Sequence, residues 1–443
     1  MRVLALDVGS SSVRAVPYDE RAREVGEAAH ETYEPSLGPD GSAELDADEL
    51  VEACRAVLDA AGSAYDALAI SCFWHSLLLL DGGNRPLTPV LLWQDRRSVT
   101  QAEQLARGLD GERVHQRTGC VLHPSYWPAK LAWLVDERPD TFVRAKRAVS
   151  FGDHLFLHLS GELRTTLSSA SGTGLVDLRA RAWDRELLDA IKLDPALLPP
   201  IDDDPVGTVY PAIGDGACSN LGAGCTTADR AALMIGTSGA YRVLREGEPQ
   251  TRPGLFSYFL DERHVVEGGA VSDGGNLLAW LHRALGAAPT ADRPPVSHGL
   301  TFLPLLGGER STGWNPRATG AVTGLRLGTG AADLAQAALE GIAYRLADIA
   351  DGLPEVEEIV ATGRALLTSP EWMQLCADVL GRPVAASDVR EGSARGAAVH
   401  VLERLGIEPE PAPLGETYEP DLERTAIYAV ARARQRDLYE RLF

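Results

Sequence analysis

The chain has 443 residues, of which 42 are basic and 63 acidic, and its formal charge of −21 argues against nucleic acid or an anionic membrane as a partner. A hydrophobic fraction of 45% and a charged fraction of 24% are typical of a globular protein, and the length suggests more than one domain. We expect a cytoplasmic protein without signal peptide or membrane span, because no segment has 18 consecutive apolar residues and the six cysteines form no C-x-x-C pair.

The first predicted element is a β-hairpin between Val3 and Val16, with two apolar runs on either side of a turn at Gly9–Ser12. Asp7 lies in the first run, where a buried carboxylate needs a partner, and Arg14 lies in the second. The turn also carries three hydroxyl groups, those of Ser10, Ser11 and Ser12. Such a turn offers the donors that a phosphate requires, and Asp7 is placed to hold a metal through water. An ordinary hairpin has the same pattern.

Strands and helices alternate after this hairpin, which predicts an α/β protein. We expect helices at Asp48–Ala61, Ser98–Gly108, Tyr126–Val135, Asp153–Leu159 and Trp183–Ala190. We expect strands at Ala67–Ser71, within Phe73–Asp81, at Pro89–Trp93 and at Ala148–Phe151. The small, polar segment Ser168–Leu178 is predicted to be a loop.

Polar and aromatic side chains follow two of these strands, in the segment Cys72–Arg97. The candidates for binding a ligand are His75, Ser76, Trp93, Asp95 and Arg96. Strand ends of α/β proteins open into the ligand crevice, where Asp and Arg can bind the hydroxyls of a polyol and Trp can pack on its carbon face. The alternatives are a solvated helix start for the arginine and core packing for the tryptophan.

Asp215, between Gly214 and Gly216, is the best candidate for a catalytic acid or base. The flanking glycines leave its carboxylate uncovered, and a hydroxyl that attacks phosphorus needs a group to accept its proton. Aspartate is also common in ordinary glycine turns. We place the domain boundary just after this glycine-dense segment, which gives domains at 1–226 and 227–443.

A second hairpin, at Ala231–Leu244, repeats the pattern of the first. Its turn begins with Gly236 and Thr237, which match Gly9 and Ser10, and Arg242 follows one residue out of step with Arg14. The repeat suggests two halves of similar core, with two hydroxyl turns that face each other across a cleft and clasp a polyphosphate. Chance similarity of two amphipathic hairpins is the alternative.

The second half continues with strand, glycine turn and helix in Val265–Trp280, an exposed connection at Gly286–His298 and a turn-rich loop at Phe302–Gly324. Helices are predicted at Ala331–Leu353, Pro370–Leu380, Gly392–Leu405 and Tyr428–Leu442, and a strand at Glu358–Ala361. Thr362, Gly363 and Arg364 lie between that strand and the next helix, a usual place for a nucleotide, although a plain strand-to-helix turn fits as well.

Several familiar motifs do not occur in the sequence. No lysine lies in a glycine loop, which excludes a Walker-type phosphate site, and no G-x-G-x-x-G follows a strand. The G-x-S-x-G elbow and the H-E-x-x-H zinc motif are also missing. These observations argue against a Rossmann dehydrogenase, a serine hydrolase and a zinc protease.

Taken in chain order, the segments resemble the motifs of the FGGY carbohydrate kinases, which belong to the actin-like ATPase superfamily. The resemblance covers essentially the whole chain. It rests on DVGSSSVRA, Gly214–Gly216, Gly236–Gly239, Leu339–Gly341, ATGRALLTSPEWMQLCADVLGRPV and Gly396–Ala398. It implies an α/β fold in which two actin-like (ribonuclease H-like) ATPase domains flank a central cleft, with ATP and Mg²⁺ as cofactors.

Within the family, the segments Trp74–Leu77 with LLLLD, RPLTPVLLWQDRRS and GTSGAYR are most similar to the gluconate kinase branch. This resemblance implies phosphorylation of D-gluconate at its terminal hydroxyl, with Asp215 as base and with Asp7 and Asp215 beside Mg²⁺. The implied phosphate-binding residues are Ser10, Ser11, Ser12, Arg14, Gly236 and Thr237, and the implied adenosine-binding residues are Gly363, Arg364 and Ser369. The implied sugar-binding residues are His75, Ser76, Trp93, Asp95, Arg96, Tyr126 and Asp215, with Arg96 as the hypothesis for the carboxylate.

The sequence departs from the family pattern at Arg364, where a second glycine is usual, and at Asp273 and Thr312. We expect a small sugar acid or polyol as the partner, while the sequence leaves open whether the chain forms a homodimer. Three alternatives to a gluconate kinase stay open here. They are the same fold acting on another sugar such as xylulose, a non-catalytic actin-like module that binds ATP, and a pseudokinase weakened by Arg364.

Overall fold

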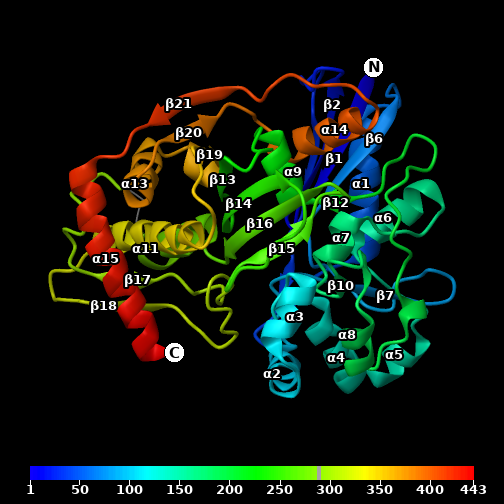
Figure 1. Cartoon of the computed structure of the whole chain (residues 1–443), viewed down its shortest axis with the longest axis horizontal. Helices are drawn as coiled ribbons and strands as arrows, with labels where there is room; N and C mark the ends of the chain where they lie inside the picture. The colour runs from blue at the N-terminus through cyan, green and yellow to red at the C-terminus, as the bar shows by residue number, and fades with distance from the viewer. Residues whose placement is uncertain (287–290) are drawn as a thin grey trace.

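The computed structural model describes residues 1–286 and 291–443, which form two halves, each built on a central sheet (Figure 1). The first sheet has the order β12-β6-β1-β2-β3, from β1 (Arg2–Val8), β2 (Ser12–Asp19), β3 (Ala29–Thr32), β6 (Ala67–Cys72) and β12 (Ile213–Gly214). The second has the order β15-β16-β14-β13-β19-β20-β21, from β13 (Arg230–Ile235), β14 (Gly239–Glu246), β15 (Phe256–Phe259), β16 (His264–Val271), β19 (Glu358–Thr362), β20 (Val384–Ser387) and β21 (Leu414–Tyr418).

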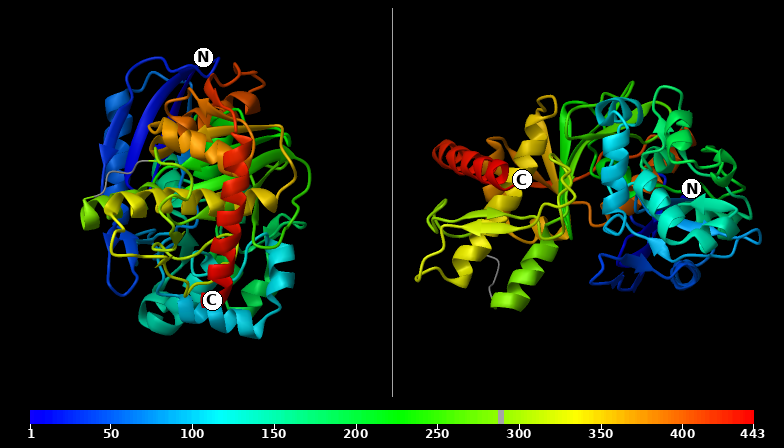
Figure 2. Two further views of the ribbon diagram at one scale, coloured as in Figure 1. Left: turned by 90° about the vertical axis from the view of Figure 1, so that its left-hand side faces the viewer. Right: turned by 90° about the horizontal axis from the view of Figure 1, so that it is seen from below.

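The first half of the chain also contains nine α-helices, all within the described residues 1–286. They are α1 (Ala47–Ala61), α2 (Val99–Gly108), α3 (Gly111–Thr118), α4 (Trp127–Glu137), α5 (Pro139–Arg144), α6 (Phe151–Ser160), α7 (Leu167–Ser171), α8 (Arg185–Ala190) and α9 (Asp215–Gly222). The second half has α10 (Gly275–Leu285), α11 (Ala331–Asp351), α12 (Arg364–Leu367), α13 (Pro370–Leu380), α14 (Gly392–Arg404) and α15 (Leu422–Leu442), the last on the outside of the molecule (Figure 2). In the part of the chain that the structure describes, no helix combines the length and the apolarity needed to cross a membrane.

Short strands complete the fold. They are β4 (Ser36–Leu37), β5 (Ala43–Leu45), β7 (Leu78–Leu80), β8 (Val90–Leu91), β9 (Arg147–Val149), β10 (Val176–Asp177), β11 (Ala182–Trp183), β17 (Thr301–Leu303) and β18 (Ala321–Thr323). The mixed α/β class expected from the alternation of strands and helices is therefore confirmed.

Both predicted hairpins are present, and each continues into a parallel neighbour. β1 pairs antiparallel with β2 and parallel with β6, just as β13 pairs antiparallel with β14 and parallel with β19. Asp7 lies opposite Arg14 in the first hairpin, whereas Arg242 lies opposite Ala232 in the second. When the two turns are aligned, Met234 occupies the position of Asp7. The two hairpins therefore share a backbone arrangement, but the second hairpin has no carboxylate at this position.

The segment Val3–Leu6 of β1 is apolar without interruption because both faces of the first sheet are covered. Leu4 and Leu6 share a core cluster with Leu50 of α1, while Val3 and Ala5 share another with side chains of α9 and α14. Successive side chains of a strand point to opposite faces, so that an uninterrupted apolar run suits such a strand. Helix α14 follows β20 in the chain and yet lies against the first sheet (Figure 1).

Two predicted loops contain regular structure. Ser168–Leu178 was expected to be a loop, but Leu167–Ser171 forms the short helix α7, capped by Thr166. Ser168 and Ser171 are buried and bond to backbone groups, and Ser168 Oγ accepts a hydrogen bond of 3.1 Å from the Gly214 N–H. The predicted loop Phe302–Gly324 has β17 and β18 paired at its ends. Part of the predicted connection Gly286–His298, residues 287–290, lies outside the described residues.

Helices α9 and α14 cross at close range between the two halves. A Cβ atom on Gly396 would overlap the carbonyl of Cys218, and one on Gly222 would overlap the carbonyl of Gly392. Glycine at these positions therefore lets the backbones of the two helices touch along the middle and the end of α9.

We expect the substitution Gly396→Ala to lower the free energy of unfolding by about 1–3 kcal/mol, since the added methyl group overpacks the crossing. The measurement is denaturant unfolding followed by circular dichroism. Gly392→Ala is the matched control, because a Cβ on Gly392 in the same helix meets no atom within 4 Å. Equal stability of the two variants would contradict the importance of this contact.

Candidate functional site

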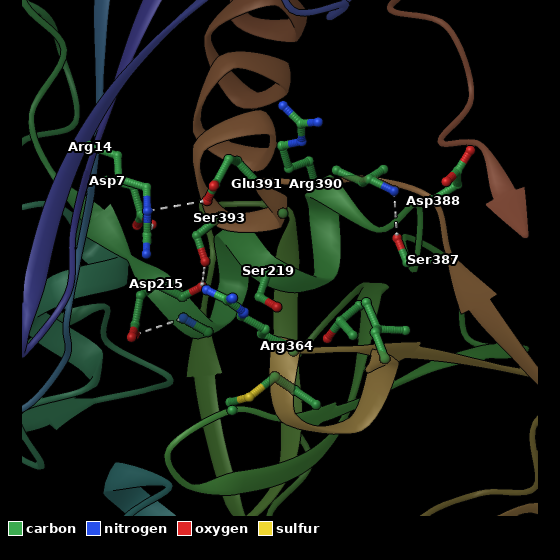
Figure 3. Close-up of a pocket in the computed structure, with 18 of the residues that line it drawn as sticks. Asp7, Arg14, Asp215, Ser219, Arg364, Ser387, Asp388, Arg390, Glu391 and Ser393 are labelled. Carbon is green, nitrogen blue, oxygen red and sulfur yellow. Dashed lines mark hydrogen bonds and ion pairs between the residues drawn. The ribbon is translucent and has the colours of Figure 1, made fainter. Parts of the chain in front are cut away.

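A cavity of about 830 Å³ opens between the two halves, with walls from both sheets. We call it the large cavity, and its polar lining comprises Asp7, Arg14, Asp215, Ser219, Arg242, Thr362, Arg364, Thr368, Ser387, Asp388, Arg390, Glu391 and Ser393. Figure 3 shows Asp7, Arg14 and Asp215 on one side and Asp388 with Arg390 on the other. The site thus combines groups that are far apart in the sequence.

Asp7, at the end of β1, is buried beside the large cavity with 9% of its surface exposed. Its Oδ1 accepts a hydrogen bond of 2.8 Å from Ser71 Oγ, and its Oδ2 lies 3.9 Å from Arg14 Nη1. Burial raises the pKa of Asp7 to about 6, and the negative charge of Asp215 adds to this effect. Two carboxylates that influence each other therefore line the same cavity.

Asp215 is the first residue of α9 and lines the large cavity. Its Oδ1 accepts a hydrogen bond of 2.8 Å from the Gly216 N–H. Burial raises the pKa of its carboxyl, while the nearby charge of Arg242 opposes that increase. A Cβ on Gly214 or Gly216 would overlap the Trp74 indole, so that the flanking glycines make room for an aromatic wall beside the carboxylate.

The two hydroxyl turns lie at the ends of their hairpins. In the first turn, Gly9 N–H bonds to Ser12 O at 2.9 Å, Ser12 is buried, and Ser10 and Ser11 are more exposed. In the second turn, Gly236 lines the large cavity and the neighbouring Thr237 is exposed. The three serine side chains and Thr237 are not among the cavity-lining residues, and their contact with phosphate stays a prediction.

The turn after β19 forms the far end of the large cavity. Gly363 has a φ of +88°, and a Cβ there would crowd the carbonyl of Ile235, so that only glycine fits. Arg364 begins α12 with an exposed side chain that lines the cavity, whereas Ser369 caps α13 by accepting a hydrogen bond of 3.3 Å from Trp372 N–H. The structure therefore places Ser369 in the helix cap and not in the cavity lining.

A small cavity of about 90 Å³ adjoins the large one and shares Asp215, Gly216, Met234 and Arg242 with it. Its remaining polar and aromatic lining comprises Trp74, His75, Trp93, Ser238, Phe256, Tyr258 and Arg310. The two cavities therefore meet at one carboxylate. An inner cavity of about 20 Å³ adjoins the small cavity at Trp93 and Arg310 and is also lined by Asp95, Arg96 and His123.

His75 is held in a left-handed backbone conformation with a φ of +68°. Burial lowers the pKa of its imidazole well below the usual range, so that the ring is neutral. Its Nδ1 lies 2.6 Å from Gly172 O and donates to that carbonyl, which leaves Nε2 as an acceptor facing Arg310 Nη2 at 3.4 Å. The structure thus brings His75 and Trp93 together, as the sequence predicted.

Three predicted sugar-binding residues are engaged with protein groups. Ser76 is fully buried, and its Oγ accepts a hydrogen bond of 3.1 Å from Phe151 N–H. Asp95 accepts hydrogen bonds from Ala43 N–H and from Arg97, and it lines only the inner cavity. Tyr126 is fully buried, with its hydroxyl 2.6 Å from that of Tyr258. Of these three residues, only Asp95 lines a cavity, the inner one, and their sugar contacts remain predictions.

Lys130 was missed as a candidate because it lies in an apolar helix with no motif around it. Its side chain is 1% exposed, and Nζ donates to His75 O at 2.7 Å and to Leu92 O at 2.8 Å. Burial lowers the pKa of this ammonium group to about 7. One lysine therefore ties together the two strand ends that carry His75 and Trp93.

Sequence reasoning also missed Arg242 and Arg310 as site residues. The sequence did show that Arg242 lies one residue out of step with Arg14 in the repeated hairpin, and this offset was the available sign that Arg242 has a different position. Arg310 lies in the segment expected to be a loop, and only the fold brings it to Trp93, with its guanidinium 4.9 Å from the ring centre. Glu391 was missed as well, and its Oε2 lies 3.5 Å from Arg14 Nε.

Comparison with known protein families shows which family the chain belongs to. Residues 2–215 match the N-terminal domain of the FGGY family of carbohydrate kinases, and residues 231–401 match its C-terminal domain. This chain belongs to the FGGY family. It is an ATP-dependent sugar kinase with the two-domain fold of the actin-like ATPase type.

Two kinds of FGGY kinase are similar to this chain to about the same degree. The gluconokinase of Bacillus subtilis (strain 168) is 30% identical over 454 residues, which cover 91% of this chain and 88% of that protein. The xylulose kinase of Escherichia coli (strain K12) is 28% identical over 490 residues, which cover 99% of both. The relatives therefore leave the choice of sugar open.

Solved structures give the same picture. The gluconate kinase from Lactobacillus acidophilus has a TM-score of 0.89 at 26% identity and covers 100% of this chain and 98% of its own. A ligand-bound xylulose kinase from Lactobacillus acidophilus has a TM-score of 0.90 at 26% identity, with the same coverage. This chain therefore shares the FGGY fold with both solved kinases, and their near-equal similarity does not identify its sugar.

We expect the substitution Lys130→Met to raise KM for the sugar by about 10- to 100-fold, because small displacements of binding groups weaken positioning strongly. KM for ATP should change little, since Lys130 contacts neither wall of the large cavity. Steady-state kinetics with each substrate varied in turn measures both constants. The exposed Lys146→Met is the control, and a parallel rise of both KM values would show that Lys130 acts on the fold in general.

Proposed function

We propose that this FGGY kinase transfers a phosphoryl group from ATP to the terminal hydroxyl of D-gluconate, which gives 6-phospho-D-gluconate. The observation that carries the proposal is the position of Asp215, which lines both the large and the small cavity. A nucleotide in the large cavity and a sugar acid in the small one would meet at this carboxylate. The choice of gluconate is supported by two guanidinium groups, Arg242 and Arg310, in the small cavity.

In this proposal Asp215 accepts the proton of the attacking hydroxyl. The group must be deprotonated to do so, and its raised pKa makes it a stronger base than an exposed aspartate. Trp74 and Tyr258 exclude water from one side of the small cavity. Exclusion of water favours transfer to the sugar over hydrolysis of ATP.

Asp7 and Asp215 fit the needs of Mg²⁺. Burial raises the pKa of both carboxyls, and the negative charge of Asp215 adds to the increase at Asp7, an effect that a bound divalent cation would oppose. Within residues 1–286 and 291–443 no three His, Cys, Asp or Glu side chains are placed to hold a metal, so in this proposal the two carboxylates would hold the ion partly through water. When bound, Mg²⁺ supplies positive charge to the phosphate oxygens.

The remaining cavity residues are proposed to hold the nucleotide. Arg14 is held between Asp7 and Glu391 and faces the large cavity, where it can contact the terminal phosphates. The proposed phosphate contacts of the two turns are Ser10, Ser11, Ser12, Gly236 and Thr237. Gly363 and Arg364, with Ser369 behind them, form the proposed adenosine end.

A xylulose kinase is the second candidate, and the near-equal likeness to solved gluconate and xylulose kinases favours it specifically. A ketopentose is neutral, so that it would leave Asp215 as the one counter-charge for the two guanidinium groups of the small cavity. This electrostatic mismatch is the reason to prefer the sugar acid.

A coupled ADP-release assay with Mg-ATP across gluconate, xylulose, ribulose, glycerol and a blank without sugar tests the proposal. We expect kcat/KM to be highest for gluconate by at least about tenfold, since one buried ionic hydrogen bond accounts for that factor. Higher turnover with xylulose would favour the second candidate. ADP release that no sugar stimulates would contradict both.

We expect Asp215→Asn to lower kcat by roughly 10²–10⁴, the range for loss of a general base, and to leave the affinity for gluconate within a few-fold. Wild-type kcat should fall as the pH drops through the raised pKa of Asp215, whereas the variant should lose this titration. Rapid-quench kinetics from pH 5 to 8 measures both effects. Asp203→Asn is the control, because Asp203 also has a raised pKa but lines neither cavity. A near-normal kcat in Asp215→Asn would mean that another group accepts the proton.

A further inference from the structure

Two arginines of the small cavity are buried without a carboxylate partner. Arg242 is 4% exposed and Arg310 is 8% exposed. Across the described residues, neither guanidinium has a carboxylate oxygen within 4.0 Å, and the Nε of each has no hydrogen-bond partner. Within the described residues, the one side-chain hydrogen bond of the Arg310 guanidinium is with His75 Nε2, at 3.4 Å, and the group also lies over the Trp93 ring.

Other buried arginines of the chain are compensated. Arg345 is 2.5 Å from Glu309 Oε1, and Arg395 donates to the carbonyls of Gly222 and Glu410. Glu309 directly precedes Arg310 but is already used by Arg345 and by the Tyr439 hydroxyl. An uncompensated buried charge is costly, which makes the arrangement at Arg242 and Arg310 unusual within this fold.

The charge balance of the small cavity is positive. Asp215 is the carboxylate among its described lining residues, and the imidazole of His75 is neutral. Burial lowers the pKa of Arg242 to about 10, and the positive charge of Arg310 contributes to this decrease. Two guanidinium groups thus share one carboxylate in a space that holds little water, and an anion would supply the missing counter-charge.

We propose that Arg242 and Arg310 form an anion-binding pair that holds an anionic oxygen group inside the small cavity. This inference rests on the proposed function, since the sources of such a group are the carboxylate of the sugar acid and the phosphoryl group during transfer. Guanidinium groups bind both through charge-assisted hydrogen bonds.

The two arginines lie in different positions, and each position suggests which anionic group that arginine would bind. Arg242 lines the large and the small cavity, where a phosphoryl group passes, whereas Arg310 lines the small and the inner cavity. An extended sugar acid with its terminal hydroxyl at Asp215 has its carboxylate directed away from the large cavity, toward Arg310. Arg96 also lines the inner cavity, but it donates to Pro316 O and serves there as a second cation at most.

The test compares D-gluconate with D-gluconamide, its neutral isostere, in wild type and in the variants Arg242→Gln and Arg310→Gln. If Arg310 binds the carboxylate, Arg310→Gln should lower kcat/KM for gluconate by about 10- to 100-fold, because an ionic hydrogen bond is lost. The same variant should change kcat/KM for gluconamide by less than about threefold. For the phosphoryl group we expect Arg242→Gln to lower kcat for both sugars equally, with KM unchanged. Unchanged kcat and KM in both variants would overturn the pair.

Thermal unfolding without ligands gives a second readout that does not depend on turnover. Because Arg310 has no carboxylate partner, Arg310→Gln should keep or raise Tm, whereas Arg345→Gln, which breaks a buried ion pair, should lower Tm by several degrees. A loss in Arg310→Gln as large as that in Arg345→Gln would mean that Arg310 has a structural role and would overturn the proposal.

The same design separates failure of the pair from failure of the proposed function. If gluconate is not turned over, the proposed function fails, and the variants are then measured with the sugar of the panel that is turned over. If Arg242→Gln then lowers kcat selectively with that sugar, the result would still support an anion-binding pair, because Arg242 would bind the phosphoryl group. Wild-type kinetics in both variants with that sugar would overturn the pair independently.

Discussion

The site depends on the partial burial of the Asp215 carboxylate at the junction of two sheets. β12 ends at Gly214 and α9 starts at the next residue, so that the carboxylate sits at the strand end of the first sheet. The backbone of α9 touches that of α14, and the Trp74 indole packs beside Asp215 because the residues on either side of Asp215 are glycines. Burial raises the pKa of this group, and the nearby carboxylate of Asp7 and the cation of Arg242 are arranged around it. A base and an incoming phosphate can therefore share one small space.

A second constraint shapes the sugar side. His75 and Trp93 come from different strand ends, and the buried ammonium group of Lys130 joins the backbones of these two ends. Neutral His75 then presents its free ring nitrogen to Arg310, whose guanidinium also lies over the Trp93 ring. The wall of the small cavity thus contains a series of polar contacts that ends at the Arg310 guanidinium, and the proposed preference for an anionic substrate rests on this arrangement.

The sequence predicted the features that are local in the chain. The hairpins at Asp7 and at Gly236 follow from apolar runs around glycine turns, and Asp215 stood out between two glycines. Arg310 and Lys130 were not found because their roles depend on partners far away in the sequence, which only the fold brings near. Ser76 shows the converse, since the sequence marked it as a polar residue at a strand end but did not indicate that its hydroxyl accepts a backbone hydrogen bond inside the protein.

We propose that the terminal hydroxyl of gluconate receives the phosphoryl group at Asp215. The first measurement is phosphorus–proton correlation NMR of the product formed from Mg-ATP and D-gluconate. We expect a phosphate monoester whose phosphorus couples to the protons of a terminal methylene group, with formation slowed in Asp215→Asn. Coupling to a single methine proton, or release of inorganic phosphate alone, would contradict it.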